Sequence, residues 1–256
     1  MTLFNIVYVS TAVLAAAVLL LIAARLRRRW GKPRAIALSA ALLLITAIFW
    51  LAAPVTIGSV NRVTGVANVS ALLVYALVVA FAAATLAFAL YWRYPYAQAQ
   101  PTVRWILAAY TATIALMVVL FTVSDVPVER RTDFDTYYAD QPTVAAFLLI
   151  YLLSTLVGAR YLATQLWRWA GPDAPPNVAD RPNLQRALRL FAAATACPIL
   201  FCSIKITAIA ANWFDVHALD GLSTAAPLLN VLAVLLVLAG IAAQLRRDPA
   251  TRTATA

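Results

Sequence analysis

Lys205 is the residue whose type and position most favour chemistry, because it is a charged side chain well inside an apolar run. It lies about eight residues, or roughly 12 Å, from the outer end of its predicted helix. A charge at such a depth in a membrane is costly and usually serves binding or transport. Helical spacing places Pro198, Cys202 and Asn212 on the same helix face as Lys205, although the apolar Ile209 interrupts this stripe of small and polar residues. The pattern predicts an intramembrane site that points into a helix bundle.

The charge partner of Lys205 is not evident, since no aspartate or glutamate lies inside any of the long apolar runs. Three partners remain open: a backbone carbonyl, an amide such as that of Asn230, or an acid that dips in from an outer loop. The structural alternative is that the lysine reaches outward to the interface or forms a pair with no further role.

A second polar stripe lies on the apolar run that precedes the run with Lys205. Its residues Tyr151 and Thr155 are also assigned to the candidate intramembrane site. The full stripe lies within about one side of a helix and consists of Tyr151, Ser154, Thr155, Gly158, Tyr161 and Gln165. Helix–helix packing alone also explains a stripe of this kind.

The longest outer loop, residues 124–142, mixes carboxylates, arginines and aromatic residues. Arg131, Asp133, Asp135 and Asp140 form a candidate outer-loop ligand site. Calcium binding there is disfavoured, because the loop lacks the glycine and the terminal glutamate of an EF-hand. The alternative is a solvated loop with internal arginine–aspartate pairs.

Catalytic and metal chemistry have little support in the sequence. The single histidine, His217, has two nearby aspartates, which are too few ligands for a zinc site, and no nucleophile stands beside it. We therefore predict no enzymatic activity, no catalytic residue, no metal and no cofactor.

The elements that position these residues are predicted to be membrane helices. Apolar residues make up 64% of the 256 positions and the mean hydropathy is +0.83, more than a soluble domain can bury. A spanning helix needs about 20 mostly apolar residues. Seven runs meet this need: Leu3–Ala24, Ala35–Ala53, Ser70–Trp92, Arg104–Val123, Val144–Leu166, Leu190–Trp213 and Thr224–Leu245. The prediction is an all-α polytopic bundle of seven transmembrane helices over residues 1–245, followed by a short cytoplasmic tail, 246–256.

The orientation follows from the placement of the basic residues. They concentrate in 25–34, at Arg93, in 168–186 and in 246–252, which are the alternate connections and the tail. The positive-inside rule places these segments in the cytoplasm and the N-terminus outside. The net charge of +10 therefore reflects topology and lipid contacts, and nucleic acid is not a predicted partner.

Two segments carry a resemblance to a known family. They are Asn-Arg-Val-Thr-Gly-Val-Ala-Asn-Val-Ser-Ala-Leu-Leu-Val, 61–74, and Val-Pro-Val-Glu-Arg-Arg-Thr-Asp-Phe-Asp-Thr-Tyr-Tyr-Ala, 126–139. The chain resembles an uncharacterised actinobacterial family of seven-helix integral membrane proteins whose members are labelled as transporters. The resemblance implies the same helix order. It also implies a short form, since many members continue into a soluble C-terminal domain.

Two functions are thus open for a multi-pass protein of the cell membrane, with the lipid bilayer as its first partner. One is transport of a small solute, which the polar stripes and the resemblance favour. The other is a ligand-sensing or accessory module that signals to a separate cytoplasmic protein.

Overall fold

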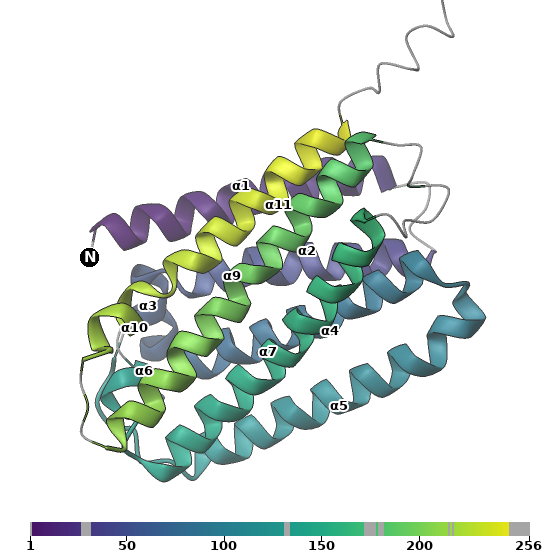
Figure 1. The fold of residues 1–256 in the computed structure, drawn as a ribbon. Helices are drawn as coiled ribbons and strands as arrows, with labels where there is room; N and C mark the ends of the chain where they lie inside the picture. The colour runs from purple at the N-terminus through teal and green to yellow at the C-terminus, as the bar shows by residue number, and fades with distance from the viewer. Residues whose placement is uncertain are drawn as a thin grey trace, which may run out of the picture.

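The computed structural model describes residues 2–26, 32–130, 134–171, 178, 182–214, 216 and 218–245, and all regular structure within them is helical (Figure 1). The helices are α1 Thr2–Leu26, α2 Pro33–Leu51, α3 Pro54–Thr64, α4 Val69–Arg93, α5 Tyr96–Thr122, α6 Phe134–Tyr137, α7 Pro142–Ala170, α9 Pro182–Asn212, α10 Asp220–Ala225 and α11 Leu228–Leu245. The expectation of an all-α chain is confirmed for this part of the sequence.

Six helical stretches in the described ranges are long and apolar enough to cross a membrane. They are α2, α4, α5, α7, α9 and the stretch Gly221–Ala243, which covers most of α10 and α11. In α1 the apolar helix is followed only over Asn5–Leu20, because the side chains before and after this stretch lie outside the described residues. The chain is therefore a multi-pass membrane protein, while a seventh span through α1 stays a prediction.

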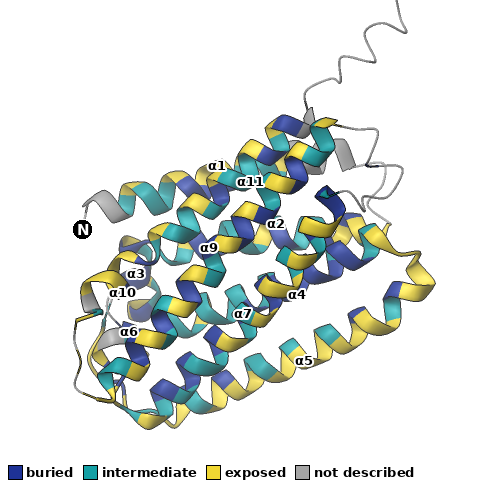
Figure 2. Ribbon diagram, in the orientation of Figure 1, coloured by how far each residue is buried: buried dark blue, intermediate teal, exposed yellow. Residues whose placement is uncertain are grey.

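The long helices form a ring with one helix outside it. Contacts follow the order α1, α2, α4, α7, α9 and α11, and α11 returns to α1. α5 lies outside this ring against α4 and α7, and most of its surface is exposed (Figure 2). The interior of the ring is thus lined by α4, α7 and α9 together with the α1–α2 and α11 walls.

The short helices mark one end of the bundle. α3, α6 and α10 lie together there, beside the start of α1 (Figure 1). We refer to it as the α6 end. The connections at this end are those predicted to lie outside the cell, so the alternation of helix direction matches the prediction.

Proline and glycine set several helix boundaries. α2, α3 and α7 each have proline in the first turn, where the missing N–H is not needed. α3 ends at Gly65, whose φ of 69° is left-handed and favours glycine. Residues 52–69 therefore fold into a short helix and a tight turn before α4 begins.

Several predicted boundaries were wrong. α5 begins at Tyr96 and not at Arg104, so Pro101 lies inside a helix although we expected it between helices. α9 begins at Pro182 and not at Leu190. Both helices extend beyond their apolar runs, because a helix continues to satisfy its own backbone groups where the side chains become polar.

The last predicted span, Thr224–Leu245, is divided. Pro227 lies in the turn between α10 and α11, whereas we expected it inside a helix. α3 and α6 were not predicted, because they are too short and too polar to resemble membrane spans.

Candidate functional site: a buried ion pair in the ring

Lys205 forms a salt bridge with Asp135 inside the bundle. The lysine side chain is 5% exposed and the aspartate side chain 14%. The lysine comes from α9 and the aspartate from α6, a helix of four residues in the connection between α5 and α7. Of the three partners left open by the sequence, the structure has the acid from a loop.

Phe134 holds α6 against the membrane helices. It is 5% exposed, and its ring contacts Tyr75 of α4 and Phe147 of α7, at centroid distances of 6.4 and 6.5 Å. Because Phe134 and Asp135 are adjacent, the buried ring fixes the position from which the carboxylate reaches Lys205.

Tyr138 fixes the other side of α6. Its hydroxyl donates a hydrogen bond to the Val128 carbonyl at 2.9 Å and accepts one from the Val128 N–H at 3.0 Å. The indole N–H of Trp213 donates to the Ala139 carbonyl at 3.3 Å. Phe134, Tyr138 and Ala139 are all buried. The alternative of a solvated loop is therefore wrong for this stretch.

Asn68 joins the same loop to the start of α4. Its side-chain amide donates to the carbonyls of Val126 and Val128 at 3.1 and 2.9 Å, and its oxygen accepts from the Arg130 N–H at 2.8 Å. Asn68 is fully buried with a left-handed φ of 60°, which asparagine tolerates better than most residues. The two segments that carry the family resemblance are thus in direct contact.

Tyrosines surround the ion pair. Tyr75 and Tyr151 stack with their ring centroids 4.5 Å apart. Tyr8, Tyr75 and Tyr151 lie within electrostatic range of the Asp135 carboxylate, and Cys202 lies within range of Tyr151. These residues come from α1, α4, α7 and α9, so the pair sits inside the ring.

Two predicted site residues have polar atoms that lack a partner among the described residues. Thr155 lies one helical turn from Tyr151 on the same face of α7 and is 6% exposed, and its hydroxyl makes no hydrogen bond there. The side-chain oxygen of Asn212, the last residue of α9, is likewise buried and unpartnered. We use the name central seam for Tyr8, Tyr75, Asp135, Tyr151, Thr155, Cys202 and Lys205.

Within the seam, Cys202 is fully buried one turn before Lys205 on α9. Of the remaining residues of the candidate intramembrane site, Pro198 is half-buried four residues before Cys202 on the same helix. Asn230 is half-buried on α11 and takes no part in the ion pair. Tyr161, which we expected on the inward stripe of α7, is 41% exposed and is corrected to the outside.

The candidate outer-loop ligand site is not assembled in the described residues. Asp135 turns inward to Lys205, whereas Asp140 is exposed. Arg131 and Asp133 lie outside the described residues. No group of three histidine, cysteine or acidic side chains that could hold a metal occurs in the part of the chain that the structure describes.

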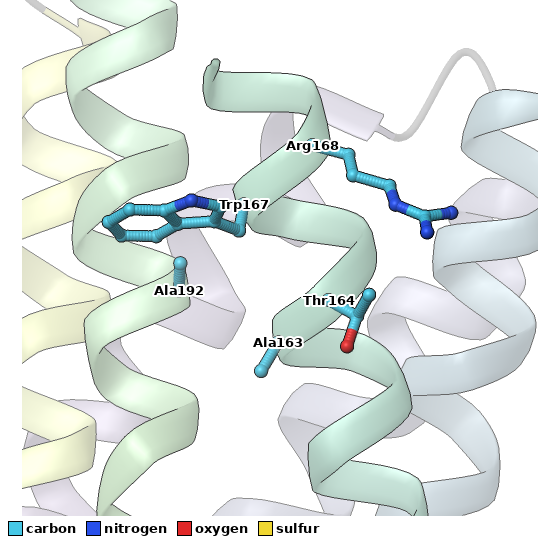
Figure 3. Close-up of a pocket in the computed structure, with 5 residues that line it drawn as sticks. All are labelled: Ala163, Thr164, Trp167, Arg168 and Ala192. Atoms are coloured by element: carbon cyan, nitrogen blue, oxygen red, sulfur yellow. The ribbon is translucent and has the colours of Figure 1, made fainter.

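One surface groove at the α6 end gathers polar groups between α3 and the loop after α5, and is lined by Gly58, Asn61, Arg62, Gly65, Ala67, Pro127 and Glu129. Another groove lies between α7 and α9, far from the α6 end, and is lined by Ala163, Thr164, Trp167, Arg168 and Ala192 (Figure 3). The indole of Trp167 extends toward Ala192, while Arg168 points away from it (Figure 3). An exposed tryptophan and arginine near a helix end are typical of an interfacial anchor.

Comparison of the chain with protein families, with curated proteins and with solved structures finds no match. The functional argument therefore rests on the ion pair and the residues around it.

Proposed function

We propose that this membrane protein is a small-solute transporter and that the salt bridge between Lys205 and Asp135 closes the central seam at the α6 end. The observation that carries the proposal is the origin of the two charges. The cation belongs to a long membrane helix, and the anion belongs to a short helix of a connecting loop.

The cost of breaking a buried ion pair would allow a solute to control whether the salt bridge is formed. Removing the partner of a buried charge typically costs about 3–5 kcal/mol, because the remaining charge is desolvated and unpaired. Asp135 can leave Lys205 only if another group takes over the stabilisation of the lysine. A solute that does so would release α6 and open the seam, which couples solute binding to the movement of a loop.

The uncharged groups of the seam support the same reading. Tyr75 and Tyr151 bring hydroxyl-bearing rings close to the pair. The Thr155 hydroxyl, one turn further along α7, is buried without a hydrogen-bond partner in the described residues. Buried polar groups usually have a partner, and those that lack one are candidates for ligand contacts.

We also propose a membrane topology for the chain and its membership in the family that it resembles. α1 would be the seventh span, the α6 end would face the outside of the cell, and the arginine-rich connections would face the cytoplasm. The resemblance of segments 61–74 and 126–139 to a family labelled as transporters supports the same function.

Uptake into proteoliposomes tests the proposal. We would measure four radiolabelled solutes of different charge: lactate, choline, alanine and erythritol. We expect uptake of at least one above that of protein-free liposomes, and we expect Lys205→Leu and Asp135→Asn to abolish it. Asp140→Asn is the matched control, since it neutralises an exposed aspartate of the same loop. Transport that persists in both seam variants would contradict the proposal.

A double variant separates transport from folding. Lys205→Met combined with Asp135→Leu removes both charges and keeps apolar volume, an exchange that often restores the stability of buried pairs. We expect this variant to regain the melting temperature of the wild type without regaining uptake. If it transports as well as the wild type, the pair is only structural.

The burial of the loop also favours the second function, sensing. A ligand that displaced α6 would disturb α9, which runs from the α6 end to the opposite end of the bundle (Figure 1). Binding without uptake of any solute, together with a cytoplasmic protein that co-purifies in equal amounts, would favour this alternative.

A further inference from the structure

The Asp135 side chain occupies an anion position next to Lys205. Its end is a methylene group and a carboxylate, which is the structure of acetate held on a tether. Among the described residues Lys205 is the charged side chain that is almost fully buried, and Asp135 is its partner, while Arg130 of the same loop lies half-buried over the Tyr137 ring of α6.

We infer that the site around Lys205 takes small monocarboxylates, and that Asp135 is a built-in mimic of such a solute. The inference rests on the proposed function and gives it a substrate class. A carboxylate from solution would replace that of Asp135 on the Lys205 ammonium group and so free α6.

The surroundings fit a carboxylate better than a cation or a neutral molecule. A cation placed here would lie against the Lys205 ammonium, and the like charges would repel at low dielectric. A neutral solute would leave the lysine without a counter-charge once Asp135 moved away. The tyrosine hydroxyl groups near Asp135 are possible donors to carboxylate oxygens.

The packing sets the size of the solute. Tyr75 and Tyr151 stack at 4.5 Å, and Phe134 and Phe147 are almost fully buried beside them. The volume that the Asp135 side chain would vacate is that of an acetate, so we expect a carboxylate of about that size, whereas a sugar acid or a nucleotide would require the aromatic rings to separate.

The route of entry is at the α6 end. The Asp135 side chain keeps 14% of its surface exposed while Lys205 keeps 5%, so the aspartate is the member of the pair that solvent reaches more easily. A variant that shortens Asp135 should therefore open a path from solution to the ammonium group.

Chemical rescue tests binding without any need for transport. Asp135→Ala removes the carboxylate and leaves space for it, so we expect a lowered melting temperature in detergent. Sodium formate or acetate should then raise the melting temperature by several degrees in a saturable manner, because a ligand that binds only the folded state stabilises it. Formamide is the neutral control of matched size, and sodium chloride controls for ionic strength and for charge alone.

Two further variants make the result specific. Asp140→Ala should show no rescue, since its carboxylate is exposed. Asp135→Ala combined with Lys205→Met should also show none, because the cation is missing. Rescue by chloride or formamide equal to that by formate would overturn the inference, and so would the same rise in Asp140→Ala or in the double variant.

The uptake panel separates this inference from the proposed function. If lactate is taken up through the seam and choline and erythritol are not, both stand. Lys205-dependent uptake of erythritol or choline alone would keep transport and overturn the carboxylate class. Rescue by formate with no uptake of any solute would keep the binding site and overturn transport.

Discussion

α5 and α9 are both long apolar helices with an internal proline, but they hold different places in the bundle. α5 has 27 residues and contains Pro101, and α9 has 31 and contains Pro198. Their most apolar windows have similar mean hydropathy, 2.0 and 1.8. Only 11% of that window is buried in α5, against 44% in α9. α9 packs between α7 and α11, while α5 lies on the outside of the ring (Figure 2).

The difference shows that hydropathy identifies a membrane helix without indicating which one carries a site. α9 has Lys205 on its buried face because Asp135 is there to pair with it. α5 has Arg104 near its start, where the side chain is exposed. The same class of residue is therefore buried and paired, or exposed, according to the helices around it, and variants on the two helices should behave differently.

The largest expected effect is at the buried pair. Lys205→Leu or Asp135→Asn alone should lower the free energy of unfolding by about 3–5 kcal/mol, because each leaves a desolvated partner charge. Chemical denaturation in detergent measures this change. On α5, Arg104→Gln is the matched control and should leave the denaturation midpoint almost unchanged. Equal effects on both helices would mean that the Lys205 pair is solvated.

The loop after α5 is partly buried, as α9 is, because hydrogen bonds from Asn68 hold it against the start of α4. Asn68→Ala removes three hydrogen bonds and should lower the free energy of unfolding by about 2–3 kcal/mol, since buried backbone groups lose their partners. Asn68→Gly relieves the left-handed φ and tests how much of the loss is backbone strain.

Limited proteolysis reports where the effect of Asn68→Ala lies. Cleavage should increase in the connection 123–141, while α9 stays protected. A stable variant with an unchanged digestion pattern would show that Phe134 and Tyr138 hold the loop without Asn68.

The third expected effect is at the packing contact between α5 and α7. A Cβ added at Gly158 would lie 2.6 Å from the Tyr110 hydroxyl oxygen, closer than real contacts allow. Gly158→Ala should therefore displace the Tyr110 hydroxyl from the Ser154 carbonyl and cost about 1–3 kcal/mol, as overpacking usually does. At Gly221 a Cβ would meet nothing within 4 Å, so Gly221→Ala is the control. Comparable losses of melting temperature in both would contradict the close approach.

The sequence was sufficient to predict the long helices and to predict that Lys205 points into the bundle. Apolar runs of spanning length predict membrane helices from composition alone, and a lysine within such a run stands out by its cost. The first span, Leu3–Ala24, corresponds to α1, but its crossing of the membrane stays a prediction.

The pairing of Lys205 with Asp135 was not predictable beyond a list of alternatives. Asp135 was assigned to a candidate outer-loop ligand site with Asp140, because the loop mixes carboxylates, arginines and aromatic residues. Its burial depends on Phe134 packing against α4 and α7, a tertiary contact that no local pattern encodes. Asn68 was also missed, since its role depends on carbonyl groups about 60 residues away in the chain.

The smallest expected effect sharpens the comparison at the α5–α7 contact. The Tyr110 hydroxyl donates to the Ser154 carbonyl at 3.1 Å, and Tyr110→Phe removes this bond at a cost of about 1 kcal/mol. In the Gly158→Ala background the same change removes the oxygen that the new methyl group would meet. Tyr110→Phe should therefore stabilise the Gly158→Ala variant, although it destabilises the wild type. Denaturation midpoints of the four proteins give the coupling, and a simple sum of the two single effects would mean that the two side chains do not meet.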